Sequence, residues 1–387
     1  QTSAMTQQQQ KEIKDIDLTP LQYLDNLIMA SKNKQTPIAL EYEKIEQCSH
    51  ESTEYFDFGM QQLKNQRCAL MILAGGAATR LGAEVPKGAF PLDLDENNRN
   101  LYQIIINKCK LLDFPRIIFM LSNSTRSTID FLQQNGFFGY PSSQIEFCFQ
   151  PEYPVISVSK QLLLNETQQI LTSPNGNGGF LKALESVSLE NLDFLHVIGV
   201  DNPFVKPCDP EMLGFASKNQ LNVVNRVLRP LRGEKVGITG QRVISAAEQA
   251  VLCSDQIQHF SFDRAVPTVF EYSEIDLDKI DVVKQFANIV NHLFSVAFLK
   301  ELMQIQIKTQ KYITPYHLAF KKVGYFDLQT NTFVAPKEEN AYKIEHFIFD
   351  YFHFCQLEKF GIFICPREEF VPIKEMGDVD KVKAAWK

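Results

Sequence analysis

The sequence lacks several features that would assign it to a specialised class of protein. None of its eight cysteines belongs to a Cys-x-x-Cys pair, which argues against zinc fingers and thioredoxin-type redox sites. No apolar run reaches the roughly 18 residues that a membrane-spanning helix requires. The polar, glutamine-rich residues 1–16 contain no apolar core of a signal peptide. We therefore expect a cytoplasmic protein with reduced thiols and no membrane contact.

Positive charge is also scarce. The chain has 39 Lys and Arg against 46 Asp and Glu, so its formal net charge is −7, whereas nucleic-acid-binding domains usually carry a basic surface. We expect no nucleic-acid partner. The 387 residues and the 44% hydrophobic fraction are those of an ordinary globular protein with a sizeable core, and this length predicts two or three structural units.

Between residues 68 and 202, short apolar runs alternate with helical patterns. Buried strands are predicted at residues 68–76, 115–123, 144–150 and 194–202, and helices at residues 100–112 and 125–134. Strands that alternate with helices predict an open α/β sheet with right-handed crossovers. In such a sheet, ligands bind at the carboxyl ends of the strands.

The flanking segments have less regular patterns. An amphipathic helix is predicted to open at Thr19-Pro20, with apolar residues that extend to Met29, and a second helical stretch covers about residues 38–64. In the C-terminal half, residues 268–275 have a strand-like pattern. Residues 282–302 and 343–356 are predicted to be helical.

The most informative segment is the loop after the first predicted strand. Residues 73–87 read Leu-Ala-Gly-Gly-Ala-Ala-Thr-Arg-Leu-Gly-Ala-Glu-Val-Pro-Lys, which matches neither the Walker pattern GxxxxGK[ST] nor GxGxxG. Gly75 and Gly76 would let the backbone approach a base or phosphate and aim N–H groups at anionic oxygens. Arg80 adds a planar cationic fork and Lys87 a compact charge. We interpret the loop as a nucleoside triphosphate site; a tight turn with surface charges is the alternative.

Two further candidate sites lie at the ends of predicted elements. Asp201 falls at the end of the strand over residues 194–202, where a carboxylate suits Mg²⁺. The competing interpretation is an aspartate that caps the turn with Asn202 and Pro203. Residues 175–179, Asn-Gly-Asn-Gly-Gly, precede a predicted helix, which suits close approach of a ligand but is equally typical of a flexible turn.

The loop pattern Gly-Gly-x-x-Thr-Arg-Leu-Gly-x-x-x-Pro-Lys resembles the signature of the eukaryotic UDP-sugar pyrophosphorylases, and among them most closely the UDP-N-acetylglucosamine pyrophosphorylases (diphosphorylases). Seven further motifs of that family recur in order at residues 147–150, 174–179, 200–210, 271–275, 287–292, 343–350 and 370–374. The resemblance extends from about residue 55 to 375. It implies an α/β, Rossmann-like nucleotidyltransferase (GT-A-like) fold, with a mixed sheet flanked by helices and an N-terminal helical cap.

The same resemblance implies a role for each matching residue. Uridine would bind to Gly75, Gly76, Gln150, Gly176 and Asn177; a glutamine amide offers both a donor and an acceptor to the imide edge of uracil. The sugar would bind to Gly237, Glu271, Tyr272, Asn288, Phe347 and Phe349. Arg80, Lys87 and Lys374 would be the catalytic cations, and Asp201 would hold Mg²⁺ (or Mn²⁺).

The implied reaction converts UTP and N-acetylglucosamine 1-phosphate into UDP-N-acetylglucosamine and pyrophosphate. A phosphate oxygen of the sugar would attack the α-phosphorus of UTP in line, and because this phosphate is already anionic, neither a covalent nucleophile nor a general base is needed. Two alternatives stay open. The protein could use another hexose 1-phosphate (an N-acetylgalactosamine, glucose or galactose form), or it could be a non-catalytic nucleotide-sugar-binding protein.

Two positions depart from the family pattern. Ala78 and Ala287 stand where the family usually has glycine. If residue 78 required a positive φ, alanine would cost about 1 kcal/mol, so we predict that Ala78 has a negative φ. Both departures slightly weaken the expectation of full activity and of the family's usual sugar selectivity.

The resemblance also predicts the domain organisation. Residues 1–64 would form the N-terminal helical segment, residues 65–374 the catalytic domain and residues 375–387 a short tail. The family usually continues past Lys374 into a small C-terminal domain, which we expect to be missing here, and we therefore expect a monomer.

Overall fold

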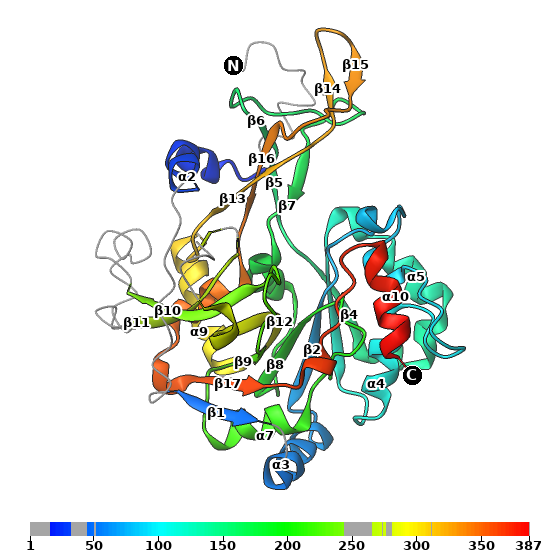
Figure 1. Cartoon of the computed structure of the whole chain (residues 1–387), viewed down its shortest axis with the longest axis vertical. Coiled ribbons are helices and arrows are strands. Elements are labelled where there is room, and N and C mark those ends of the chain that lie inside the picture. Colours follow the sequence, from blue (N-terminus) through cyan, green and yellow to red (C-terminus); the bar gives the residue numbers. More distant parts are fainter. Residues whose placement is uncertain are drawn as a thin grey trace.

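A large mixed sheet runs through the centre of the computed structural model, which describes residues 16–31, 45–49, 52–243, 265–272, 274–275, 281–310 and 312–386 (Figure 1). Its strands lie in the order β1-β17-β9-β12-β8-β2-β3-β4. Their bounds are β1 Glu46–Ser49, β17 Phe360–Ile364, β9 Val223–Leu228, β12 Phe286–Ser295, β8 Phe194–Gly199, β2 Cys68–Leu73, β3 Arg116–Leu121 and β4 Ile145–Phe149.

Neighbouring strands of this sheet are parallel except at β12, which is antiparallel to both β8 and β9. Two more strands, β10 (Gly237–Val243) and β11 (Ala265–Phe270), extend the sheet from β12 as an antiparallel ribbon. The four buried strands predicted between residues 68 and 202 correspond to β2, β3, β4 and β8, so that part of the prediction is confirmed.

Both faces of the sheet are covered, which explains why its central strands are apolar at every position. In β2, Leu70 and Ile72 pack into one hydrophobic core, whereas Ala69 and Met71 pack into the other. A strand buried on both faces cannot alternate apolar and polar residues. The run Cys-Ala-Leu-Met-Ile-Leu satisfies this condition.

Helices form the outer layers. Apolar residues of α3 (Thr53–Lys64), α4 (Leu101–Lys110), α7 (Pro210–Lys218) and α10 (Met376–Ala385) belong to the first core. The second core contains residues of α6 (Phe180–Ala183), α9 (Val296–Thr309) and the 3-10 helix η13 (Ile348–Phe354). The predicted helices over residues 100–112 and 125–134 are observed as α4 and as α5 (Thr128–Gln134).

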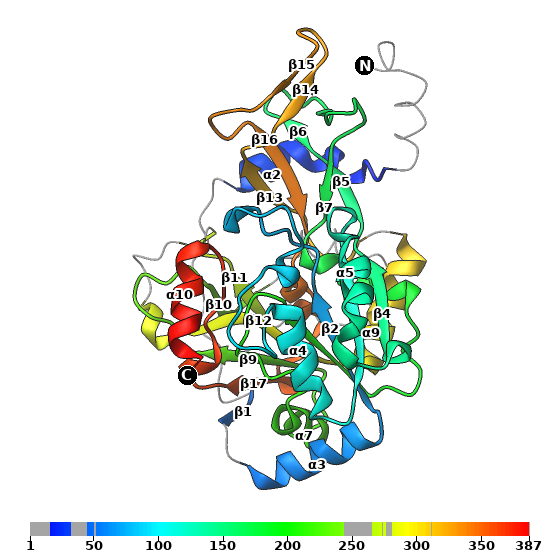
Figure 2. The same cartoon turned by 90° about the vertical axis from the view of Figure 1, so that its right-hand side faces the viewer.

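A smaller arm projects from one end of the large sheet (Figures 1 and 2). It contains a sheet in the order β13-β16-β6 and the two-stranded pairs β14–β15 and β5–β7. The bounds are β13 His317–Lys321, β16 Ala341–Glu345, β6 Ile156–Ser157, β14 Tyr325–Asp327, β15 Thr332–Val334, β5 Glu152–Pro154 and β7 Thr172–Pro174. The predicted first amphipathic helix is a 3-10 turn, η2 (Thr19–Tyr23), followed by α2 (Leu24–Ala30), and Leu24 packs into the core of this arm.

Three helix predictions are wrong in part. Residues 282–302 form the 3-10 turn η12 (Val282–Lys284), the long strand β12 and the start of α9, and residues 343–356 contain the end of β16 before η13. Within the predicted helical stretch 38–64, Glu46–Ser49 is strand β1 and only Thr53–Lys64 is helical; residues 38–44 lie outside the described part of the chain. A continuous apolar run fits a buried strand and a buried helix equally well, so periodicity does not separate them.

Strand β12 contains a bulge that faces the end of β8. Its pairing with β9 shifts register between Asn288 and His292, and Val290 between them has a φ of 52°, which is unusual for a β-branched residue. A Cβ built on Gly199 would lie 3.8 Å from the Cβ of Val290. Bulges often re-aim side chains beside functional sites, and Gly199 ends the strand that leads to Asp201.

Candidate functional site

The glycine-rich loop leaves the carboxyl end of β2 and folds back on itself. The Lys87 amide donates to the Gly76 carbonyl at 3.0 Å, and the Ala78 amide donates to the Val85 carbonyl at 2.9 Å. Ala78 has a φ of −84°, so the prediction that this departure from glycine is free of backbone strain is confirmed. The positive φ of the loop falls instead on Gly82, at 71°.

An ion pair links this loop to the neighbouring strand end. Lys87 Nζ lies 3.3 Å from Asp201 Oδ2, and both side chains are half-buried. The two residues meet because β2 and β8 are parallel neighbours whose carboxyl ends reach the same edge of the sheet. The Ile373 amide donates to the Asp201 carbonyl at 2.9 Å, which brings the chain before Lys374 to the same place.

Gly75 and Gln150, two of the predicted uracil-binding residues, are in close contact. Gln150 is buried just after β4, and a Cβ added to Gly75 would lie 2.0 Å from its Nε2. Ser122 Oγ donates to the Gly75 carbonyl at 2.9 Å and fixes the start of the loop. A Cβ on Gly76 would meet nothing within 4 Å, so that position is open for a ligand.

The other two predicted uridine-binding residues lie on a turn that packs against the chain before η13. Gly176 has a φ of 85°, and a Cβ there would lie 2.4 Å from the His346 carbonyl oxygen. Asn177 Oδ1 accepts a hydrogen bond from the Ile348 amide at 2.9 Å. The glycine is therefore required by both φ and space, and the asparagine oxygen holds the start of η13.

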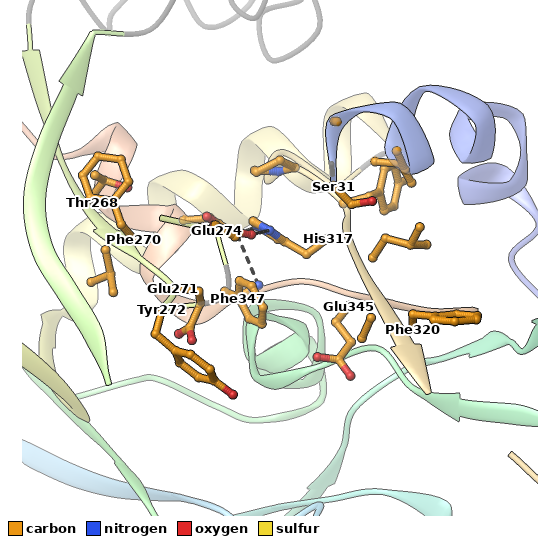
Figure 3. A pocket seen from close by; sticks show the side chains of 18 of the residues that line it. Ser31, Thr268, Phe270, Glu271, Tyr272, Glu274, His317, Phe320, Glu345 and Phe347 are labelled. Carbon is orange, nitrogen blue, oxygen red and sulfur yellow. Dashed lines mark hydrogen bonds and ion pairs between the residues drawn. The ribbon is translucent and has the colours of Figure 1, made fainter. Parts of the chain in front are cut away.

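A cavity of about 670 Å³ opens between the large sheet and the arm, and Glu271, Tyr272 and Phe347 are among its lining residues (Figure 3). These three residues carry predicted sugar contacts. The remaining predicted sugar residues lie next to this lining. A Cβ on Gly237 would be 3.2 Å from Glu271 Oε1, and the Phe349 ring lies 5.0 Å from that of Phe347.

Asn288, the last predicted sugar residue, pairs with Gly237 across β10 and β12. Its side chain is only 6% exposed, and within the described part of the chain its Oδ1 has no hydrogen-bond partner. A buried polar atom without a partner is energetically costly. This is the state expected of a group that a ligand satisfies.

Two half-buried carboxylates line the cavity. Burial raises the pKa of Glu271 to about 7, and Glu274 adds to the rise, while the positive charges of His317 and Lys374 oppose it. Burial also raises the pKa of Glu345, against the opposing charges of Lys321 and Lys343. In Figure 3, Glu271 and Glu345 point into the space below Phe347 from different segments.

Three residues of this region were not predicted from sequence. His317 lies between Glu274 and Asp350, with both nitrogen-to-oxygen distances at 2.9 Å. Burial disfavours the charge on His317, but Asp350 and Glu274 outweigh it and raise the His317 pKa to about 10. Glu274 and Asp350 fall inside the motifs at residues 271–275 and 343–350, whereas no motif marked His317.

Arg80 and Lys374 are exposed, unlike the half-buried Lys87 and Asp201. Arg80 is exposed on the 3-10 turn η4 (Thr79–Leu81). Lys374 is exposed, with Nζ 3.5 Å from the Lys235 carbonyl, and it lines a second cavity of about 600 Å³ beside α10. Both are described residues, and neither makes an ion pair with Asp201.

The donor set is compatible with a single Mg²⁺. Within the described residues, no cluster of three or more His, Cys, Asp and Glu side chains could hold a metal ion. Mg²⁺ usually takes one or two protein carboxylates and fills its other positions with water and phosphate oxygens. Asp201 alone would therefore suffice as the protein ligand of Mg²⁺ if a nucleotide supplied phosphate oxygens. In the same part of the chain, no helix combines the length and apolar character needed to cross a bilayer.

The mixed sheet, with the glycine loop and the charged strand ends at one edge, indicates a nucleotidyltransferase α/β fold. A putative UDP-N-acetylglucosamine pyrophosphorylase from Entamoeba histolytica superposes with a TM-score of 0.71 at 24% identity, covering 91% of this chain and 87% of that one. The predicted fold class, a nucleotidyltransferase α/β fold, is thereby confirmed.

The family follows from sequence comparison. A family model described as "UTP--glucose-1-phosphate uridylyltransferase" matches residues 21–384. The probable UDP-N-acetylglucosamine pyrophosphorylase of Schizosaccharomyces pombe is 31% identical over 82% of this chain and 68% of its own length. The Saccharomyces cerevisiae UDP-N-acetylglucosamine pyrophosphorylase is 30% identical over 89% and 74%. The chain belongs to this UDP-sugar pyrophosphorylase family.

Proposed function

We propose that the protein is a uridylyltransferase that makes UDP-N-acetylglucosamine and pyrophosphate from UTP and N-acetylglucosamine 1-phosphate. The observation that carries the proposal is the Lys87–Asp201 pair at 3.3 Å, located where the glycine loop meets the end of β8. It provides one cation for phosphate and one carboxylate for a metal at the edge of the sheet where ligands bind in this fold class. The family membership and the names of the yeast relatives support the choice of reaction.

In this proposal the residues align two anions and offset their repulsion. Lys87 contacts the phosphates directly, and Arg80 and Lys374 add positive charge from the loop and from the segment before α10. Asp201 would hold Mg²⁺ (or Mn²⁺), which when bound supplies further neutralisation of phosphate charge. The sugar phosphate is already anionic, so positioning and electrostatic stabilisation account for the rate without a protein base.

The cavity beside the phosphate site would receive the sugar. Glu271 can accept hydrogen bonds from sugar hydroxyls, and the apolar faces of Tyr272 and Phe347 can pack on the ring or the acetyl group. Gln150 and Gly75 would contact uracil, with the open side of Gly76 leaving room for the base.

The direct test is pyrophosphate release from UTP and Mg²⁺ with a panel of sugar 1-phosphates. We expect the fastest release with N-acetylglucosamine 1-phosphate and slower release with the N-acetylgalactosamine, glucose and galactose forms. Release from glucose 1-phosphate at the highest rate would reassign the sugar. No release with any sugar, together with tight binding of UDP-N-acetylglucosamine, would favour the binding-protein alternative.

The metal role of Asp201 has its own test. Asp201→Asn is expected to raise the Mg²⁺ concentration for half-maximal activity by about tenfold or more, because it removes the protein carboxylate from the site. Asp130→Asn on the exposed face of α5 is the matched control. An unchanged Mg²⁺ requirement in Asp201→Asn would remove Asp201 from the metal site.

A cytoplasmic location and a monomeric state belong to the same proposal. Seven cysteines of the described residues are buried free thiols, which suits a reducing compartment. A sizing column tests the monomer, and a stable dimer would contradict it.

A further inference from the structure

One histidine joins the walls of the sugar cavity. His317 begins β13, its Nδ1 lies 2.9 Å from Glu274 Oε1, and its Nε2 lies 2.9 Å from Asp350 Oδ2. Its ring also lies against Phe347, with the ring centroids 4.2 Å apart. Figure 3 shows Glu274, His317 and Phe347 grouped at one side of the cavity. Three segments distant in sequence therefore meet at one imidazole.

The partners of His317 determine its protonation state. Both ring nitrogens face carboxylate oxygens, and an ionised carboxylate can only accept hydrogen bonds. Both nitrogens must then donate, which the imidazolium does and the neutral ring does not. Asp350 Oδ2 also accepts from the Phe347 amide at 3.2 Å, so the charge, the carboxylate and the backbone of Phe347 form one connected group.

Glu274, the other carboxylate beside His317, also contacts the backbone of Glu271. The Glu274 amide donates to the Glu271 carbonyl at 2.8 Å, which closes a turn. By holding the Glu274 side chain, His317 fixes the turn that presents Glu271 and Tyr272 to the cavity. The same imidazole therefore supports both the polar wall at Glu271 and the aromatic wall at Phe347.

We propose, on the basis of the proposed function, that the His317 imidazolium is a positioning residue that sets affinity for the sugar half of the nucleotide-sugar. It acts through Glu274 on Glu271 and through Asp350 on Phe347. It makes no contribution to binding of the uridine half, because the uracil residues Gly75 and Gln150 lie at the ends of β2 and β4.

The charges around His317 predict how the pH dependence of binding should change when its positive charge is removed. The charge of His317 lowers the pKa of Glu271 against the effect of burial, with Lys374 acting in the same direction and with Glu274 and Asp350 opposing. The other titratable groups coupled to His317 are Glu345 on β16, His346 before η13 and His353 on η13. Burial lowers the pKa of both of these histidines, so they stay neutral at pH 7. Removal of the His317 charge should therefore raise the pKa of Glu271 further.

The test measures binding of UDP-N-acetylglucosamine and of UDP by calorimetry, with His317→Gln and wild type. We expect His317→Gln to weaken UDP-N-acetylglucosamine binding about tenfold, the effect of one charge-assisted hydrogen bond, and to leave UDP binding unchanged. The pH at which UDP-N-acetylglucosamine binding reaches half its maximum should move upward in the variant. His317→Lys restores a cation and should recover part of the affinity.

A second variant keeps the test decisive if His317→Gln does not fold. Glu274→Gln removes the charge of one partner only, and it should weaken UDP-N-acetylglucosamine binding several-fold while UDP binding is kept. Glu339→Gln, an exposed carboxylate before β16, is the matched control and should bind as wild type. Circular dichroism and melting temperature report whether each variant is folded.

The outcomes separate this inference from the proposed function. Equal weakening of UDP and UDP-N-acetylglucosamine, or unchanged binding in folded His317→Gln and Glu274→Gln, overturns the inference while turnover by the wild type still supports the function. A wild type that binds UDP-N-acetylglucosamine no more tightly than UDP also overturns it. A wild type that binds UDP-N-acetylglucosamine more tightly than UDP but releases no pyrophosphate overturns the catalytic proposal alone.

Discussion

Lys87 and Asp201 neutralise each other at the edge of the sheet, with Nζ 3.3 Å from Oδ2. The proposed ligands would bind these same two side chains, since a phosphate attracts the lysine and a metal cation attracts the aspartate. Arrival of a metal–nucleotide complex would then exchange one internal ion pair for two external ones. The pair keeps both half-buried charges compensated until that exchange takes place.

Replacement of Lys87 tests its part in the reaction. Lys87→Ala should lower kcat by about 10²–10³-fold, as expected for the loss of one transition-state donor. Lys300→Ala on the exposed face of α9 is the control and should keep wild-type turnover. Pyrophosphate release measures kcat for both variants. Near-wild-type turnover in Lys87→Ala would exclude a catalytic role for Lys87.

The glycine loop offers a matched pair of backbone substitutions. Ala78 has a negative φ, so Ala78→Gly should destabilise the fold by about 0.5–1 kcal/mol through chain entropy and should not raise kcat. Gly82 has a φ of 71° with no atoms near a new Cβ, so Gly82→Ala should cost about 1 kcal/mol from backbone strain alone. Urea denaturation measures both; a gain of activity in Ala78→Gly would show that the alanine impairs the loop.

Neighbouring glycines of the same loop should respond differently. A Cβ at Gly75 would overlap Gln150 Nε2 at 2.0 Å, whereas a Cβ at Gly76 meets nothing within 4 Å. We expect Gly75→Ala to displace Gln150, with loss of UTP binding and a lower melting temperature. Gly76→Ala should melt as wild type and raise only the KM for UTP. Equal KM values for Gly76→Ala and wild type would place the nucleotide elsewhere.

The raised pKa of Glu271 predicts opposite effects of pH on stability and on binding. Because its pKa rises from 4.5 to about 7 in the folded, ligand-free state, Glu271 stabilises the fold at pH values below 4.5, and this contribution is lost as the pH rises through 7. The full effect is up to about 3 kcal/mol. Affinity for UDP-N-acetylglucosamine should instead rise through pH 7, because the ionised carboxylate is the stronger acceptor.

Glu271→Gln should remove both dependences. Denaturation and calorimetry from pH 5 to pH 8 measure them, with the exposed Glu338→Gln as the control. A pH dependence of UDP-N-acetylglucosamine binding that persists in Glu271→Gln would assign the titration to another group.

The sequence predicted the parallel half of the sheet because burial on both faces leaves an unmistakable apolar run, as in Cys68–Leu73. It did not predict β12, because Phe286–Ser295 contains the same kinds of residues as the helix that follows it. The change from strand to helix occurs at Ser295, whose side chain accepts from the Phe298 amide. A helix cap of this kind is readable only once a boundary is suspected.

The predicted site residues all come from family motifs, and the contacts that His317 makes with residues of two different motifs were not predicted. Gly75 contacts Gln150 after the ends of β2 and β4, and Lys87, on the loop that follows β2, pairs with Asp201 after the end of β8. His317 was missed because a single histidine at the start of a strand carries no signal until the sheet brings Glu274 and Asp350 to its two nitrogens.

The pairing of β1 with β17, in which Glu46 lies opposite Gly361, has a consequence for biosynthesis. Within the described residues, β1 pairs only with β17, so it has no partner until β17 has been synthesised. Until then β1 and β9 both present unpaired edges, the surfaces through which nascent chains misassemble. Closure of the sheet at this edge is therefore a late folding event.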